Sequence, residues 1–483
     1  FIATARSHTG ITLIALIITI ILLLILAGVT IHFTLGENGI LRNAGIAANK
    51  YKQAGENEKN MLDQIYAYIN GEEKLQPNTP ETKAGTPVEI PNEWYTNSPT
   101  LYSMPELKEI EKSKRTASVY AVSDGQNNTI PIPVGFYYVG GNLSTGVVIS
   151  DNKEDANKYK NVENGKVPSG IKVEIVDGKK KIVDELQGNQ FVWIPCEEEE
   201  YKKCDTWNGI KQYYNSNASE LASGNWDKTT NSAELTQIKK YGGFYIGRYE
   251  AGLPSSIEEA TTAISGSATE YNTVAKPQSK AGRVPWNSID YLNAQKSARS
   301  MYNIGSVTSG LITGTQWDVM LNKMQASGEI TGEDIVNSKN WGNYANTELQ
   351  INIGRKSKVH ADSYATPRIQ EPFGEIEQSI INIEDDTQNV IIKKPLGNED
   401  LLSYLLTTGS SNQARVYNIY DVAGNLHEWT EESSNFGENA NIYISCRGGN
   451  LWNVNAGSSY RNCRFLTNGL GIQMGFRVVL YVK

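Results

Sequence analysis

The chain has 483 residues, an apolar content of 39% and a formal net charge of −8. Its length exceeds the size at which a single core stops growing, so we expect two or more folded units. The negative charge, without a cluster of lysine or arginine, excludes nucleic acid as a partner, because phosphate binding requires a basic surface.

The first predicted element is an apolar helix over residues 11–36, which carry no charged side chain. Crossing a bilayer takes about 20 apolar residues, so the run is long enough to span one. A leader over 1–10 with Arg6, Gly10 as the processing site and Ile11 as the first mature residue resembles a type IV prepilin. That resemblance implies a retained membrane anchor and other pilins as partners. Ala15 stands where the family carries glutamate, so polymerisation in a pilus and a plain signal-anchor helix both stay open.

Arg6 marks the cytoplasmic side of this helix, which places the rest of the chain outside the cell. We therefore expect a single-pass protein of the bacterial cell surface with an extracellular C-terminal domain. Residues 37–71 continue the helix, with an apolar stripe at three- and four-residue steps that fits packing either in a filament or on the protein's own domain. Residues 72–117 form a linker, and the stalk it provides is stiffened by Pro77, Pro80, Pro87, Pro91 and Pro99.

A different texture begins at residue 118 and runs to 483, where short apolar runs alternate with Gly, Asn, Asp and Ser. This pattern is typical of short strands and turns with a few helices. Residues 191–195 predict a strand, whereas a strand at 242–250 and a helix at 289–302 are expected from their similarity to one known family. A second helix is expected to begin after residue 311, with Thr313 or Thr315 as N-cap and Gln316 completing a capping box.

Several phrases of this region occur in the order found in one known family. Residues 244–250, 284–302, 311–318, 341–343, 416–429, 447–450 and 475–479 together resemble the formylglycine-generating enzyme (sulfatase-modifying factor) family, over roughly 130–483. The resemblance implies an α+β fold class, namely a C-type lectin-like head. On this reading the head is carried by the N-terminal transmembrane or pilin-like helix and its Pro-rich stalk.

The same resemblance implies a structural calcium ion at residues 421–428. Carried over residue by residue, its ligands would be the side chains of Asp421 and Glu428 and the backbone carbonyls of Gly424 and Leu426. Oxygen ligands of both kinds suit a hard cation. The alternative is that both carboxylates face solvent.

Members that are oxidases bind copper(I) with two cysteines at a Cys-x-x-x-x-Cys spacing. Here Cys463 stands at one of these positions, but Ser458 occupies the other, and a hydroxyl does not replace a thiolate for copper(I). We therefore expect no copper and no enzyme activity. Two disulfides, Cys196 with Cys204 and Cys446 with Cys463, are conceivable, and the pairing stays open.

Between the last two phrases lies a segment rich in Asn, Ser, Tyr, Trp and Arg, residue types that dominate recognition surfaces. It resembles the variable segment of proteins that diversity-generating retroelements mutate at adenines. The candidate ligand-binding residues are Asn450, Trp452, Asn453, Asn455, Ser459, Tyr460, Asn462, Phe465 and Asn468.

These observations together predict a pilin-like, membrane-anchored surface protein of the adhesin or receptor type that binds an unknown protein or glycan. The alternatives are a formylglycine-generating oxidase homologue, an undiversified binding domain and a structural minor pilin. The frequency of asparagine elsewhere in the chain also fits a composition bias without diversification.

Overall fold

The chain divides into two compact units, residues 1–85 and 86–483, and the computed structural model describes only part of the second. The described residues are 119–483, with gaps at 124–128, 205, 208–209, 212–231, 255–256, 258–270, 346, 352, 362–366, 370–388, 392–400, 437–440, 454–455, 466–470 and 472. The expected leader, helices and proline-rich linker, up to residue 117, lie outside this part.

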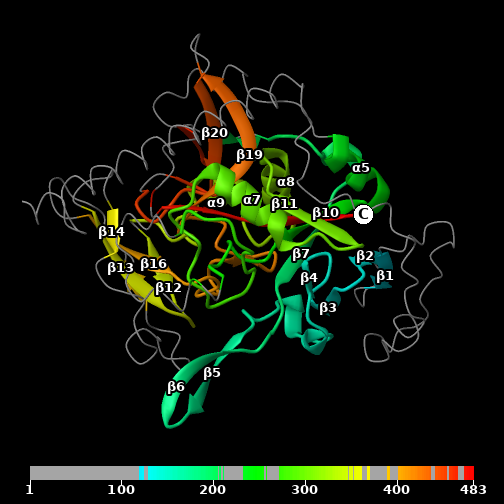
Figure 1. Cartoon of the computed structure of the whole chain (residues 1–483), viewed down its shortest axis with the longest axis horizontal. Coiled ribbons are helices and arrows are strands. Elements are labelled where there is room, and N and C mark those ends of the chain that lie inside the picture. The colour runs from blue at the N-terminus through cyan, green and yellow to red at the C-terminus, as the bar shows by residue number, and fades with distance from the viewer. Residues whose placement is uncertain are drawn as a thin grey trace, which may run out of the picture. The chain divides into compact units, whose positions relative to one another are not determined.

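A six-stranded sheet forms the centre of the described unit (Figure 1). Its strand order is β11-β23-β10-β7-β4-β3, and every pair is antiparallel. Most of its residues are buried, because the aromatic and branched side chains of these strands pack on both faces of the sheet. The strands are β3 (Tyr137–Gly140), β4 (Val147–Ser150), β7 (Gln190–Pro195), β10 (Gly243–Gly247), β11 (Val307–Leu311) and β23 (Val478–Val482).

A four-stranded sheet, ordered β21-β20-β19-β22, carries the C-terminal segment. Strand β22 (Met474–Phe476) runs parallel to β19 (His427–Phe436), whereas β20 (Asn441–Arg447) and β21 (Arg461–Phe465) pair antiparallel. The register of β19 shifts between Trp429 and Ser433, which marks a β-bulge.

Smaller sheets and three 3₁₀ helices complete the described elements. The strands are β1 (Val119–Ser123), β2 (Thr129–Pro133), β5 (Ile171–Val176), β6 (Lys179–Asp184), β8 (Thr206–Trp207), β9 (Ile210–Lys211), β12 (Glu348–Gln350), β13 (Lys356–Ala361), β14 (Pro367–Ile369), β15 (Asn389–Ile391), β16 (Leu401–Leu406), β17 (Arg415–Val416) and β18 (Ile419–Tyr420). The 3₁₀ helices are η2 (Lys153–Asp155), η3 (Glu163–Gly165) and η4 (Glu198–Glu200). The hairpin β5–β6 extends away from the central sheet (Figure 1).

The described α-helices are α5 (Ser232–Tyr241), α7 (Tyr291–Met301), α8 (Gly314–Ala326) and α9 (Gly332–Asn337). Asp290 caps α7 through a hydrogen bond from the backbone N–H of Asn293. Thr313 caps α8, and Gln316 completes the capping box as expected from the sequence. The predictions of helices near 289–302 and after 311, and of strands at 191–195 and 242–250, are confirmed at this local level.

The expected fold class is nevertheless wrong. Strands dominate the described region and only four α-helices occur in it, so the α+β class with a C-type lectin-like head on a long helix is not what is found. The physical reason is the short length of the apolar runs, which are bounded by turn residues and therefore form sheets rather than helices.

The predicted single-pass membrane anchor is not supported either. Within the described ranges, no helix combines the length and the apolar character that a membrane crossing requires. Residues 11–36, on which the anchor was predicted from an apolar run, lie outside those ranges.

Candidate recognition site in the C-terminal segment

The structure describes the side chains of six of the nine candidate ligand-binding residues, which fall into two groups. Asn450, Trp452, Ser459 and Asn462 are buried, with exposed fractions of 8% or less. Asn453 and Tyr460 are half-buried. Asn455, Asn468 and the side chain of Phe465 lie outside what is described.

The amide side chains at the start of the segment hold a tight turn. Gly448 and Gly449 adopt φ values of 86° and 72°, which L-residues with side chains rarely reach. The Asn450 side chain then accepts a hydrogen bond of 2.8 Å from the Trp452 N–H, and the Asn453 side chain accepts one of 2.8 Å from the Asn450 N–H. These asparagines therefore shape the backbone, as Asx turns do.

Two serines fasten the middle of the segment to the C-terminal end of α9. The Ser458 hydroxyl donates to the Ile335 carbonyl at 3.0 Å, and the Ser459 hydroxyl donates to the same carbonyl at 3.2 Å. The Ser458 N–H donates to the Ser338 hydroxyl at 2.8 Å. The position that holds a copper-binding cysteine in the resembled oxidases is therefore a packed hydroxyl in this chain.

Tyr460 rests on a buried histidine. Its ring is stacked on that of His427, with centroids 6.2 Å apart and planes 19° from parallel. The Asn462 amide nitrogen lies 3.3 Å from His427 Nε2. Burial, together with the nearby charge of Arg464, lowers the pKa of His427 to about 3, so the imidazole is neutral at pH 7. The half-buried Tyr460 ring thus has a rigid support.

A buried ion-pair network fixes strand β20, which precedes the segment, and strand β21, which lies within it. Asp318 of α8 accepts hydrogen bonds from Arg447 at 2.6 Å and from Arg461. Glu432 lies 3.5 Å from Arg447 and 3.4 Å from Arg461. Burial raises the pKa of Glu432, but the surrounding positive charges outweigh burial and lower it to about 2. A residue that precedes the candidate segment and a residue in its middle are therefore both anchored to α8 and β19.

The predicted calcium turn has an unusual backbone. Asp421, Gly424 and Asn425 have φ values of 59°, 74° and 60°. Asp421 Oδ2 accepts a hydrogen bond of 2.7 Å from the Gly409 N–H. Both oxygens of Glu428 accept from Arg477, at 2.9 and 2.6 Å. Glu428 is thus paired with an arginine rather than open to a cation.

A third buried carboxyl group, which the sequence did not single out as a ligand, adjoins this turn. Glu250 Oε1 accepts a hydrogen bond from the Asn425 amide, and Oε2 has no hydrogen-bond partner among the described residues. Burial, then the charges of Asp421 and Glu428, raise the pKa of Glu250 well above its usual value. Three carboxyl groups therefore share one guanidinium, that of Arg477, as their hydrogen-bonded or electrostatic counter-charge.

No group of three or more His, Cys, Asp or Glu side chains in the described part is placed to hold a metal ion. This leaves the calcium prediction untested, because backbone carbonyls formed half of the expected ligand set.

Among the described thiols, Cys196 is buried and forms no disulfide. Along the strand pair β20–β21, Cys446 pairs in register with Asn462 and Cys463 pairs with Ser445, so the two cysteines are not register partners. Burial raises the pKa of the Cys196 thiol to about 12, which keeps it protonated and unreactive at pH 7.

Comparison with known proteins gives no family assignment. No protein-family model matches the chain, and a search of the curated proteins finds no match.

Proposed function

We propose that the chain is a recognition protein without oxidase activity, in which residues 450–468 display a binding surface for a protein or glycan. One observation supports this proposal above the others, namely the division of the segment into a buried frame and partly exposed side chains. Asn450, Trp452 and Ser459 belong to the frame, the half-buried Asn453 is hydrogen-bonded to it through its side-chain oxygen, and the half-buried Tyr460 reaches the surface. A rigid aromatic next to adaptable amides on a fixed frame suits a recognition surface.

If a retroelement diversifies the segment, the positions that form or bond to the frame should vary less than those that reach the surface. The test is sequencing of the codons for 450–473 across a population of the source cells, together with the flanking DNA. We expect substitutions at adenine-bearing codons to reach position 460 and to spare positions 450, 453 and 459, because changes at the latter three would break the frame. Equal variation at all four positions would contradict the proposed division, and an invariant segment without a template copy would favour a fixed ligand.

The proposal also holds that the chain does not oxidise cysteine. Ser458 supports this, because its hydroxyl is buried and bonded to Ile335 and a serine oxygen is a poor ligand for copper(I). A peptide with a sulfatase-type cysteine motif, incubated with the protein, copper and a reductant in air, should form no aldehyde. Aldehyde detected by mass spectrometry would overturn this part of the proposal.

A structural calcium ion is a further proposal, favoured by the excess of buried carboxyl groups around Glu250. The unpartnered Glu250 Oε2 and the buried Asp421 would supply oxygen ligands, together with the carbonyls of Gly424 and Leu426. Glu428 fits less well, since Arg477 occupies both of its oxygens. Added calcium should raise the melting temperature if the ion binds the folded state.

A further inference from the structure

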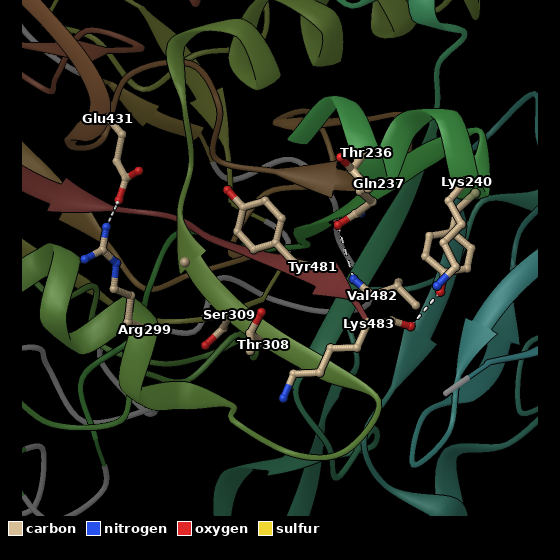
Figure 2. A pocket seen from close by; sticks show the side chains of 12 residues that line it. Thr236, Gln237, Lys240, Arg299, Thr308, Ser309, Glu431, Tyr481, Val482 and Lys483 are labelled. Atoms are coloured by element: carbon tan, nitrogen blue, oxygen red, sulfur yellow. Dashed lines mark hydrogen bonds and ion pairs between the residues drawn. The ribbon is translucent and has the colours of Figure 1, made fainter. Parts of the chain in front are cut away.

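A cavity of about 360 Å³ lies between α5, α7 and the strands β11 and β23, away from the C-terminal segment (Figure 2). Its wall includes Lys240, Lys483, Arg299 and Glu431, with Thr308 and Tyr481 between them. The volume falls near the lower end of the range for small-molecule sites, roughly 300–1,000 Å³. The cavity is therefore large enough for a ligand of about the size of one sugar residue.

The wall is held by hydrogen bonds within the protein. The Gln237 side chain accepts from the Val482 N–H at 3.2 Å and donates to the Gly243 carbonyl at 3.3 Å. The Tyr241 hydroxyl donates to the Lys483 carbonyl at 2.6 Å (Figure 2). Helix α5 is thereby fixed to the end of β23, so the cavity is preformed and its ordering adds little to the cost of binding.

One end of the cavity carries a neutralised pair. Arg299 donates to Glu431 Oε1 at 3.0 Å, and Gln295 donates to the same oxygen at 2.9 Å. Both contacts use Oε1, which leaves Glu431 Oε2 able to accept hydrogen bonds from a ligand. Because the arginine balances the charge, this end favours neutral donors such as hydroxyl groups.

The other end carries two exposed lysines. Lys240 Nζ lies 4.8 Å from the centre of the Tyr241 ring, and Lys483 Nζ donates to the Ile304 carbonyl at 2.8 Å. Lys240 lies in the last turn of α5, where the helix dipole is negative, so the positive charge of this end comes from the side chains alone. Lys483 Nζ also donates to Asn303 Oδ1 at 3.2 Å, and neither lysine has an ion pair with a carboxylate side chain of the described residues. On a chain of net charge −8, two such lysines favour an anion at this end.

Tyr481 lies between the two ends (Figure 2). Its ring crosses β11 at Gly310, where an added Cβ would stand 2.8 Å from a ring carbon. Burial raises the pKa of the Tyr481 hydroxyl well above its usual value, so the ring is uncharged. The cavity thus presents an aromatic surface flanked by an anion site and a hydroxyl-accepting site.

We propose that this cavity binds an acidic sugar, that is, a hydroxylated ring bearing one carboxylate. The carboxylate would lie between Lys240 and Lys483, the ring would pack on Tyr481, and ring hydroxyls would donate to Glu431. A phosphate ligand fits less well, because the guanidinium that would bind it in a bidentate manner is already paired with Glu431. This site is independent of the recognition function proposed for residues 450–468.

The test is calorimetric titration of the full chain with D-glucuronate, with D-glucose and inorganic phosphate as comparison ligands. We expect glucuronate to bind with a dissociation constant below about 1 mM and glucose to bind at least five-fold more weakly, since a partly exposed charge pair contributes about 1 kcal/mol. Lys240→Gln and Lys483→Gln should each weaken glucuronate binding about five-fold. The affinity of both variants for glucose should not change.

Lys239→Gln is the matched control, because Lys239 neighbours Lys240 in sequence but pairs with Glu198 at 2.9 Å outside the cavity. It should leave glucuronate affinity unchanged. Equal weakening by this control would indicate nonspecific surface attraction, and glucuronate that fails to bind at about 10 mM would overturn the proposal. Phosphate that binds as tightly as glucuronate and competes with it would show an anion site without sugar recognition.

Gly310→Ala provides a second variant that keeps all the charges. The added methyl displaces the Tyr481 ring and should weaken glucose and glucuronate by the same factor. Gly305→Ala is its control, because a Cβ there meets nothing within 4 Å. Unchanged affinity in Gly310→Ala, with Tyr481 shown to have moved by a crystal structure of the variant, would contradict the role of the ring.

Discussion

Three carboxyl groups and one guanidinium share the interior beneath residues 421–428. Glu428 is satisfied by Arg477, whereas Glu250 and Asp421 face each other's charge without a counter-ion of their own among the described residues. A buried carboxylate is costly unless it is paired, so a proton or a bound cation must offset the charge. The two cases differ in how stability responds to pH and to calcium.

Burial is the main cause that raises the pKa of Asp421 to about 7, against an ordinary value near 3.8. The folded state therefore retains this proton over a pH range in which the unfolded state has lost it, and stability should fall as the pH rises from about 4 to 7. Asp421→Asn keeps an acceptor for the Gly409 N–H but cannot ionise. We expect its melting temperature to exceed that of the parent by about 2–4 °C at pH 8 and to match it near pH 4.

Calcium would reverse that comparison. A bound ion would stabilise the ionised parent above pH 7, so calcium would raise the melting temperature of the parent but not that of Asp421→Asn. A second outcome is that calcium leaves the melting temperature of both proteins unchanged, while the parent loses stability with rising pH and Asp421→Asn does not. In that case the proton rather than the ion offsets the buried charge. A parent whose stability is flat between pH 4 and 8 would contradict both accounts.

The buried ion-pair network gives a second prediction at the residue scale. Asp318→Asn removes the carboxylate that both Arg447 and Arg461 contact, so that Glu432 is the one remaining carboxylate with a described ion pair to these two buried guanidinium groups. Loss of one partner in such a network costs about 3–5 kcal/mol of unfolding free energy, measured by denaturant titration. Glu198→Gln, which breaks the surface pair with Lys239, should cost less than about 1 kcal/mol. Similar losses in the two variants would show that the network contributes no more than a surface pair.

At the scale of elements, the turn at 421–428 depends on close backbone contact. Gly424 has φ 74° and forms a bridge with Asn343, and an added methyl would overlap the Asn343 carbonyl. Gly178, in the tip of the β5–β6 hairpin, has nearly the same φ of 75° but nothing within 4 Å of an added Cβ. Substitution by alanine would therefore strain the backbone equally at both positions, but only at Gly424 would the added methyl group clash with a neighbour.

Gly178→Ala should consequently cost about 1–2 kcal/mol of unfolding free energy, the strain of a left-handed conformation. Gly424→Ala should cost more than about 3 kcal/mol, because it also separates the turn from Asn343. Denaturant titration of the two variants at one pH measures the difference. If the losses are equal, backbone strain alone accounts for both glycines and the contact with Asn343 is not needed.

Sequence signals for these elements differ in what they could reveal. The capping box of α8 was predictable, because Thr313 and Gln316 lie within one turn and their types define the cap. The burial of Ser459 was not predictable, since the Ile335 carbonyl to which it donates lies in helix α9, far away in sequence, and a serine among asparagines is typical of a surface. The role of Glu250 likewise depends on Asn425 far along the chain, which no local pattern indicates.

At the scale of the whole described unit, the strand nearest the end of the chain lies inside the central sheet. Strand β23 pairs with β10 on one side and with β11 on the other. Its residues Val478, Val479 and Leu480 are buried. The sheet is therefore completed by contacts between segments distant in sequence, a topology that slows folding.

Removal of residues 478–483 should therefore abolish cooperative thermal unfolding. Without β23, two facing edges of the sheet lose their hydrogen bonds, and the core loses four buried apolar side chains, Val478, Val479, Leu480 and Val482, whose burial contributes about 1.5–3 kcal/mol each. The control shortens the β5–β6 hairpin by replacing residues 174–181 with Asn-Gly, which removes the exposed Ile175 but keeps the buried Ile171. This variant should unfold cooperatively, with a melting temperature within about 4 °C of the parent. A cooperative transition in the truncated chain would show that the sheet forms without β23. The position of β23 inside the sheet would then not be required for the stability of the fold.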